Sequence, residues 1–250
     1  MLNRDQLERY RRNILLAGFG PEGQEKLLNS GVLLVGAGGL GSPAAFYLAA
    51  AGVGRIGLLD GDRVELSNLQ RQILHGAPDL GRPKAESGRD RLLHLNPDLK
   101  VEAIAGRLTE ENAPGLIARY DLVLDCTDNF KTRFIMNDAC LRLNRPFVYG
   151  GVLGYIGQLM VVMPGEGPCF RCLYRHEPEG NVPDCSTVGV LGAVPGVIGT
   201  LQAGEAVKYL TGVGKLLVGR LLTYDALTAS FMEVGLERDP HCPSCGAKSD

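Results

Sequence analysis

Residues 32–60 read VLLVGAGGLGSPAAFYLAAAGVGRIGLLD, and this stretch decides the fold. It opens on Val32–Val35, a short valine and leucine run without charges, which is typical of a strand buried on both faces of a parallel sheet. A glycine-rich loop follows, then an apolar segment with helical character, and then a second apolar strand that ends at Asp60. The order strand, loop, helix, strand is that of one unit of a parallel α/β sheet.

The glycines of the loop have the spacing of a phosphate-binding turn. Gly36, Gly38 and Gly41 fall in the G-x-G-x-x-G register, where side chains would keep the backbone away from a phosphate, and Gly39 lies among them. Asp60 follows at the tip of the next strand, where a carboxylate can accept a hydrogen bond from a ribose hydroxyl. We therefore expect a Rossmann-like nucleotide site, with a merely structural turn as the alternative.

Three residues define the limits expected for the helix after this loop. Ser42 can cap its N-terminus, Pro43 fits the first turn, and Gly52 can end it.

The composition and the distribution of apolar residues argue against nucleic-acid binding, secretion and membrane insertion. With 26 basic and 28 acidic residues in 250, the chain shows no electrostatic footprint for nucleic acid. Its first 30 residues contain no apolar signal region, so we expect a cytoplasmic protein. The uncharged run Cys185–Gly204 carries five glycines and a proline, which favours a buried loop and helix over a membrane span.

The rest of the chain reads as one continuous α/β domain over residues 1–250. Residues 1–31 look helical, 32–150 form the nucleotide-binding half, and 151–250 form a half with antiparallel strands. Further strands are expected at 101–104, 122–125, 147–149, 158–162, 221–224 and 231–234, and further helices at 84–95, 132–144 and 198–210. The fold class is therefore α/β, with a mostly parallel sheet flanked by helices and extended by antiparallel strands.

Several charged and polar residues follow the ends of the predicted strands. They are more numerous than the residues that a nicotinamide cofactor site requires. They are Asp60, Asp62, Asn68, Arg71, Lys84 and Asp128. In open parallel sheets ligands bind at the carboxyl ends of the strands, which places Asp128 beside the glycine loop. Cations can hold a triphosphate and Asp128 can take Mg²⁺, whereas a G-x-x-x-x-G-K-[ST] loop is absent from the sequence. The residues thus favour ATP bound with its α-phosphate open to attack.

Seven cysteines in a reducing compartment indicate metal ligation, catalysis or burial rather than disulfides. Two C-x-x-C pairs, Cys169/Cys172 and Cys242/Cys245, supply the ligand set of a closed tetrahedral structural Zn²⁺ site. Two redox motifs or four unrelated buried thiols are the competing interpretations. Cys126 and Cys140 lie in apolar patterns and are expected in the core.

Taken together, the motifs resemble those of the MoeB/ThiF family, bacterial relatives of ubiquitin-activating enzymes. The resemblance spans almost the whole chain and includes, besides the glycine loop and the two cysteine pairs, Arg9-Tyr10-x-Arg12, Asp60-x-Asp62, Ser67-Asn68-Leu69-Gln70-Arg71-Gln72, Arg82-Pro83-Lys84 and Leu124-Asp125-Cys126-Thr127-Asp128-Asn129. It implies ATP-dependent adenylylation of the C-terminal glycine carboxylate of a ubiquitin-fold sulfur carrier ending in Gly-Gly, with release of pyrophosphate. It also implies a homodimer and a structural zinc ion.

Residue roles carry over by position in the shared motifs. Asp60 would hold the ribose, Asn68, Arg71 and Lys84 the phosphates, and Asp128 Mg²⁺, with Gly39, Asp62 and Gln72 also counted among the nucleotide-binding residues. Arg12 would reach the phosphates bound by the neighbouring subunit; without the resemblance it reads as part of a solvated basic face.

Cys185 lies in a loop ahead of a helix, whose dipole favours thiolate. In the ThiF-like branch the corresponding cysteine can join the carrier covalently or carry sulfur, so Cys185 is either a reacting group or an incidental thiol. The sequence around it is slightly more like ThiF, of the thiazole pathway, than MoeB, of the molybdenum-cofactor pathway. A sulfurtransferase partner belongs to the same expectation.

Two other classes of function stay open at this point. An NAD-dependent oxidoreductase is supported by the glycine loop alone. A non-catalytic, zinc-bearing adaptor is disfavoured because every proposed polar position is filled.

Overall fold

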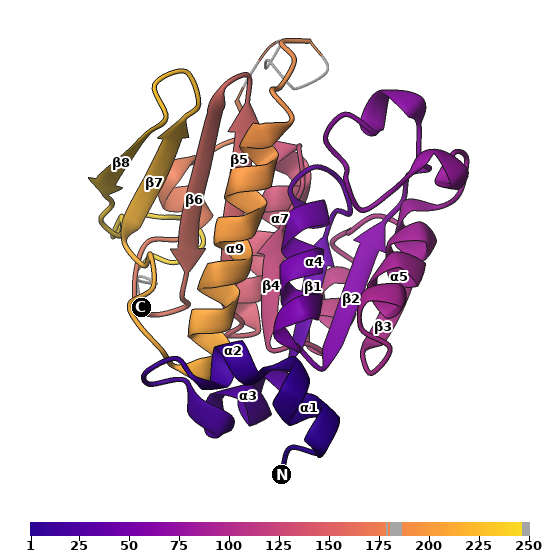
Figure 1. Ribbon diagram of the computed structural model, residues 1–250. Helices are drawn as coiled ribbons and strands as arrows, with labels where there is room; N and C mark the ends of the chain where they lie inside the picture. Colours follow the sequence, from indigo (N-terminus) through magenta and orange to yellow (C-terminus); the bar gives the residue numbers. More distant parts are fainter. Residues whose placement is uncertain (179, 181–186, 247–250) are drawn as a thin grey trace.

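The computed structural model describes residues 1–178, 180 and 187–246, in which eight strands form a single sheet (Figure 1). The strand order is β3-β2-β1-β4-β5-β6-β7-β8. The strands are β1 Gly31–Val35, β2 Arg55–Asp60, β3 Lys100–Ala105, β4 Leu122–Asp125, β5 Phe147–Leu153, β6 Ile156–Val162, β7 Arg220–Asp225 and β8 Ser230–Gly235.

The first five of these strands are parallel, and the last three extend the sheet in antiparallel fashion. β1 pairs in parallel with β2 on one side and β4 on the other, with Val32 opposite both Ile56 and Leu122. The order reverses between β1 and β4, and such a reversal opens a crevice at the carboxyl ends of the strands where ligands bind. The expected sheet with its antiparallel extension is confirmed.

Helices cover both faces of the sheet. They are α1 Arg4–Arg9, α2 Arg11–Ile14, α3 Gly20–Asn29, α4 Gly41–Ala51, α5 Lys84–Leu95, α6 Ala113–Ile117, α7 Phe130–Arg142, α8 Phe170–Leu173 and α9 Ala193–Thr211, with short 3₁₀ turns at Leu66–Asn68 and Ala77–Asp79. In Figure 1 α4, α5 and α9 lie in front of the sheet and α7 lies behind it.

The buried strands explain both hydrophobic layers. Along β1, Val32 and Leu34 join the core under α4 and α9, while Leu33 and Val35 join the core under α6 and α7. Successive side chains of a strand point to opposite faces, so an uninterrupted apolar run fills two cores at once. This is why the valine and leucine run of β1 carries no polar residue.

The N-terminal helices close the end of the sheet at which the parallel strands begin. The backbone N–H of Gly54 donates to the carbonyl of Leu27 (2.9 Å), and that of Arg55 donates to Ser30 (3.1 Å). Buried Asn96 donates to the hydroxyl of Tyr10 (3.0 Å) and so joins the end of α5 to α1 and α2. The glycine loop lies at the opposite end (Figure 1).

The expected role of Ser42 as an N-terminal cap is wrong. A cap at Ser42 would start the helix at Pro43, but the helix begins two residues earlier, at Gly41, and its N-cap residue is Leu40. Ser42 lies inside the first turn, where both its backbone N–H and its hydroxyl donate to the carbonyl of Gly38, at 2.9 and 2.6 Å. The tight glycine turn brings the carbonyl of Gly38 within hydrogen-bond distance of the first turn of the helix. Pro43 lies in the first turn as expected, and Gly52 ends the helix with φ of +89°.

Other boundaries moved by a few residues. α7 begins at Phe130 because the side chain of Asn129 accepts a hydrogen bond from the N–H of Thr132 (2.9 Å). α9 begins at Ala193 and includes glycines and Pro195, which sequence patterns disfavour within helices.

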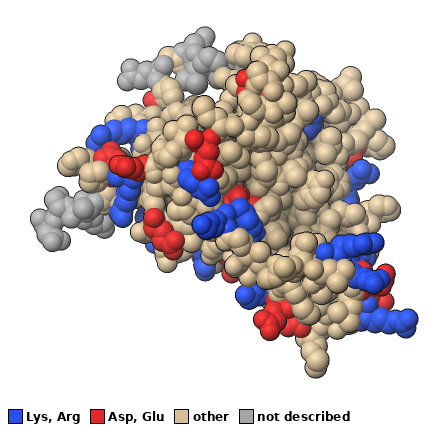
Figure 2. Space-filling view, turned by 60° about the vertical axis from the view of Figure 1, so that its left-hand side comes forward, with Lys and Arg blue, Asp and Glu red and all other residues tan. Residues whose placement is uncertain are grey.

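Among the described residues no helix is long and apolar enough to cross a membrane. On the face that Figure 2 shows, acidic and basic side chains lie next to each other in several places.

Candidate functional site: a polar pocket at the glycine loop

The glycine loop takes a conformation that side chains would block. Gly36 has φ of +105°, and a Cβ atom there would lie 2.5 Å from the carbonyl oxygen of Cys126. A Cβ on Gly41 would overlap the carbonyl oxygen of Gly36. The loop therefore turns tightly between β1 and α4, in contact with the end of β4.

Asp60 fixes this loop from the neighbouring strand. Its Oδ2 accepts the backbone N–H of Ala37 at 2.8 Å, and its Oδ1 accepts the N–H of Asp62 at 2.8 Å. Each carboxylate oxygen has a further lone pair, and Asp60 lines the pocket, so a ribose hydroxyl can still donate to it.

A pocket opens at the carboxyl ends of β1, β2 and β4, where the strand order reverses. Nine of the predicted nucleotide-site residues line it: Gly36, Gly38, Gly39, Asp60, Asp62, Arg71, Gln72, Lys84 and Asp128. These residues come from five separate segments of the chain. The fold thus brings together glycines, cations and carboxylates that sequence spacing could only place near strand ends.

Two cations of the pocket, Lys84 and Arg71, are held by other groups of the chain. Lys84 begins α5, its side chain is only 8% exposed, and its Nζ lies 3.3 Å from Asp62 Oδ2. Arg71 donates from Nη1 to the carbonyl of Ser67 at 3.2 Å, which tethers its side chain. Such buried or tethered cations are suited to a multiply charged ligand, because little ordering is left to occur on binding.

Gln72 and Asp128 differ in exposure. The Oε1 atom of Gln72 is buried and has no hydrogen-bond partner among the described residues. A buried acceptor without a donor is costly, so it points to a ligand or water that donates to it. Asp128 is exposed at the pocket wall, with its Oδ1 3.5 Å from the side-chain nitrogen of Asn129.

Three of the predicted nucleotide-site residues that the structure describes do not line the pocket. Gly41 packs behind the loop at the start of α4, and Asn68 is buried beside the pocket, where its side-chain oxygen accepts the N–H of Glu65 at 3.2 Å. Arg12 is exposed on α2 at the far end of the sheet. Cys185 lies outside the described residues.

Sequence reasoning missed two arginines of this pocket. Arg107 follows β3 and donates to Asp62 Oδ1 at 3.0 Å, so Asp62 holds one cation on each side. Its place after a strand end was the signal that could have found it. Arg133 is buried on α7 and donates to the carbonyl of Thr127 at 2.7 Å, while its Nε lies 3.4 Å from fully buried Asp125. No local pattern indicated this pair.

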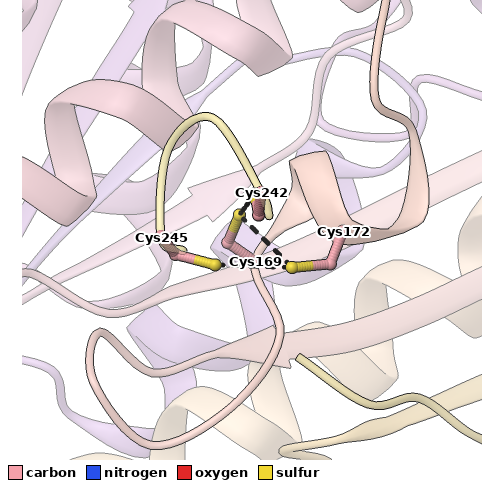
Figure 3. A group of neighbouring side chains, drawn as sticks. All are labelled: Cys169, Cys172, Cys242 and Cys245. Atoms are coloured by element: carbon pink, nitrogen blue, oxygen red, sulfur yellow. Dashed lines mark hydrogen bonds between the residues drawn. The ribbon is translucent and has the colours of Figure 1, made fainter. Parts of the chain in front are cut away.

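The four paired cysteines converge into one cluster (Figure 3). Their Sγ atoms all lie within 4.8 Å of one another, with Cys169 to Cys242 at 3.6 Å and Cys172 to Cys245 at 3.4 Å. Zinc–sulfur bonds of about 2.3 Å in a tetrahedron require sulfurs about 3.8 Å apart, so the cluster fits such an ion. The competing interpretation of four unrelated thiols does not fit this convergence.

Cys126 and Cys140 are buried as expected, and burial raises the pKa of both thiols. A thiol held in its neutral form is a poor nucleophile, so these two cysteines act in packing.

Fold and pocket together define the class of Rossmann-like nucleotide-binding proteins, with the glycine loop after the first strand and the ligand crevice at the β1/β4 reversal. The comparison with known proteins narrows this class. Residues 10–244 match the ThiF family. The chain belongs to the ThiF family, and its expected nature as an adenylyltransferase of the activating-enzyme type is confirmed.

Curated relatives are similar over nearly the whole chain. A sulfur carrier protein adenylyltransferase of Thermus thermophilus is 50% identical over 249 residues, covering 97% of this chain and 92% of the relative. A SAMP-activating enzyme E1 of Haloferax volcanii is 48% identical over 98% of this chain and 91% of its own length. An adenylyltransferase and sulfurtransferase MOCS3 of Drosophila yakuba is 48% identical over 99% of this chain, but the match covers only 55% of that longer protein.

Solved structures agree on the fold. A crystal structure of E. coli MccB with MccA-N7isoASN superimposes with a TM-score of 0.86 at 25% identity, covering 98% of this chain and 76% of that one. Another, of E. coli MccB with ATP, gives a TM-score of 0.85 at 25% identity over 98% and 75% of the two chains.

Proposed function

We propose that the chain acts as a single adenylation domain that transfers AMP from ATP to the C-terminal glycine carboxylate of a ubiquitin-fold sulfur carrier. One observation carries this proposal: a glycine loop, Arg71, Lys84 and Asp128 line one pocket where the strand order reverses. The names of the relatives from Thermus thermophilus and Haloferax volcanii, together with the structural neighbour crystallised with ATP, support the same reaction.

The reaction needs positioning and charge neutralisation rather than a covalent protein nucleophile. A carboxylate oxygen of the carrier attacks the α-phosphorus, a bond forms between them, and the bond from the α-phosphorus to the bridging oxygen breaks, so pyrophosphate leaves with that electron pair. Lys84 and Arg71 would hold the phosphates and offset the charge that grows on the departing pyrophosphate. Asp60 would fix the ribose, so that the α-phosphate faces the carrier's entry side.

Gly36, Gly38, Gly39 and Gly41 leave room for close approach of the phosphates to the loop backbone. We propose that Asn68 supports the phosphates from beside Arg71, Asp62 sets the position of Lys84, and the free acceptor of Gln72 takes a hydrogen bond at the nucleotide.

Asp128 is the residue proposed to hold Mg²⁺. Its exposed carboxylate lines the same pocket as Arg71 and Lys84, and oxygen ligands together with phosphates are what this ion prefers. When bound, the ion neutralises phosphate charge.

We propose a homodimer in which Arg12 serves the pocket of the partner. Helix α2, which carries Arg12, and the glycine loop that lines the pocket lie at opposite ends of the sheet (Figure 1). Arg12 can therefore take part in phosphate binding only in a second copy. Leu15 and Leu16 beside it are 69% and 59% exposed, and a self-complementary interface would cover them.

The cysteine cluster is proposed to bind a structural Zn²⁺ through Cys169, Cys172, Cys242 and Cys245. Four thiolates leave no open position for a substrate, so the ion would stabilise the fold, by about 10 kcal/mol or more.

For the carrier we propose docking on the β7–β8 hairpin at the free edge of the sheet. Phe231, Met232 and Val234 of β8 are 53%, 60% and 43% exposed, and exposed apolar side chains on an edge strand indicate a binding surface. We also propose Cys185 as a residue that could form a covalent bond to the carrier protein or to sulfur. A sulfurtransferase is a proposed second partner. Both ThiS-type and MoaD-type carriers fit this chemistry.

The test is carrier-dependent exchange of labelled pyrophosphate into ATP, run with ThiS-type and MoaD-type carriers. We expect exchange with at least one of them, and none with the same carrier lacking its last glycine. Absence of exchange with every carrier, together with binding of NAD in the pocket, would favour the oxidoreductase instead. ATP binding without exchange would favour the adaptor.

A further inference from the structure

His75 lies buried between the glycine loop and α5, outside every role assigned so far. It is 6% exposed. Its Nε2 lies 2.9 Å from the carbonyl oxygen of Ala37, and its Nδ1 lies 2.9 Å from the hydroxyl oxygen of Ser87.

These two contacts determine which ring nitrogen carries the hydrogen. A carbonyl oxygen can only accept, so Nε2 donates to Ala37. In the neutral ring Nδ1 then accepts the hydroxyl hydrogen of Ser87. Burial lowers the pKa of His75, which favours this neutral form.

The ring thereby joins three segments that supply the pocket. Ala37 is in the glycine loop, and its N–H is already held by Asp60, so both polar backbone groups of this residue are fixed. Ser87 is fully buried on α5, one turn after Lys84. The third segment contains Arg71 and Gln72: the backbone N–H of His75 donates to the carbonyl of Gln72 at 3.0 Å, and Gln72 directly follows Arg71.

We propose that His75 is a positioning residue: through Ala37 and Ser87 it sets the distance between the glycine loop and Lys84, and so the fit of the pocket to the phosphates of ATP. His75 does not itself line the pocket, so it acts through these two neighbours. The proposal rests on ATP as the ligand of the proposed function.

Two substitutions separate this role from simple packing. His75→Leu leaves the buried Ala37 carbonyl without its side-chain donor and breaks the link from the ring to Ser87, whose hydroxyl can still donate to Asp79. The glycine loop and α5 are then no longer joined through this position. We expect the KM of His75→Leu for ATP to rise about tenfold. His75→Gln places an amide N–H where Nε2 lies, keeps the bond to Ala37, and should stay within about threefold of the wild type.

Asn96, the residue that follows the last residue of α5, supplies a matched control. It is 1% exposed, and its side-chain nitrogen donates to the Tyr10 hydroxyl and the Ala49 carbonyl, both at 3.0 Å, at the far end of α5. Asn96→Leu therefore removes two buried hydrogen bonds without touching the glycine loop. We expect lower thermal stability in both leucine variants, but a raised KM for ATP only in His75→Leu.

The experiment measures ATP affinity by equilibrium titration and the KM for ATP by pyrophosphate exchange, in all four proteins. If His75→Leu does not fold, Ser87→Ala replaces it, with an expected rise of about threefold because one of the two bonds is lost. Equal rises in the two leucine variants, an unchanged His75→Leu, or no rescue by glutamine would each overturn the positioning role. Wild-type protein that does not bind ATP would instead contradict the proposed function.

Discussion

Asp138 of α7 accepts a hydrogen bond from the hydroxyl of Ser244 at 2.6 Å, and so ties the C-terminal cysteine pair to the body of the fold. The same carboxylate accepts hydrogen bonds from the guanidinium of Arg171, whose Nε and Nη2 lie 3.0 and 2.8 Å from its two oxygens. Ser244 stands between Cys242 and Cys245, and Arg171 stands between Cys169 and Cys172. One side chain thus holds the middle of both cysteine pairs.

We expect Asp138→Ala to weaken Zn²⁺ binding by about 10-fold or more, because residues that orient metal ligands typically contribute that much to affinity. Competition with a chelator of known affinity measures this change. Asp98→Ala, at an exposed position just before the edge strand β3, is the control and should bind Zn²⁺ like the wild type. Equal affinities in the two variants would show that the cysteines converge without help from Asp138.

Arg71→Ala or Lys84→Ala should each lower the rate of adenylylation by about 100-fold or more, since each removes a fixed cation from the developing phosphate charge. The measurement is carrier-dependent pyrophosphate exchange. Arg91→Ala, an exposed arginine on α5, should leave the rate near that of the wild type. A near-normal rate in the Lys84 or Arg71 variant would remove that residue from the site.

Mixing two inactive variants tests the role of Arg12 across the dimer. Arg12→Ala and Lys84→Ala proteins damage different parts of a site that two chains share. In a mixed dimer one site has the intact Lys84 of one chain and the intact Arg12 of the other, so random mixing should restore about a quarter of the sites. If mixing after subunit exchange restores no activity while both variants dimerise, Arg12 does not act in trans.

The local sequence pattern was sufficient to predict the glycine loop and the two strands beside it. These features lie within one stretch of about 30 residues, Val32–Asp60. Burial of the apolar strand and the close approach of a phosphate to the glycines depend only on residues within this stretch, so they could be predicted from it. The rule that ligands gather at carboxyl ends of parallel strands then placed Asp128 at the pocket correctly.

Contacts between distant segments could be predicted only where a motif marked both partners. The two C-x-x-C motifs predicted that Cys169 and Cys242, 73 positions apart, meet in one cluster, but nothing in the sequence marked Asp138 as the residue that holds both pairs. Arg133 and Asp125 pair only because α7 packs behind β4. Ser42 failed as a cap because the geometry of the preceding turn, rather than the residue's preference, decides where α4 begins.

A charge in the β7–β8 hairpin should weaken carrier binding selectively. Phe231→Asp places a carboxylate on the proposed docking surface, where the aromatic ring lies 4.8 Å from that of Tyr224. We expect the KM for the carrier to rise about tenfold while the KM for ATP is unchanged. Leu95→Asp, an exposed leucine 41% accessible at the end of α5, is the control. A parallel change in both variants would place the carrier elsewhere.

His75 should make the folded protein sensitive to mild acid. Burial lowers its pKa in the folded state below the ordinary value of 6.5; Lys84 on α5 lowers it further, while the Ala37 carbonyl, Asp60 and Asp79 act in the opposite direction. Below pH 6.5 the unfolded chain therefore binds a proton that the folded chain does not. The free energy of unfolding should fall as the pH drops from 6.5 towards the lowered value, and this loss should be absent above pH 7.

Denaturant unfolding at pH 7.5 and pH 5.5 measures the effect as the difference between wild-type protein and His75→Gln, which has no proton to gain at this position. We expect the wild type to lose more stability between the two pH values than the glutamine variant. His94→Gln, at an exposed position on α5, removes an imidazole without emptying a buried site and serves as the control. Identical losses in wild type and His75→Gln would mean that the buried ring accepts the proton without cost, and the bond from Ser87 to Nδ1 would then not restrain the pocket.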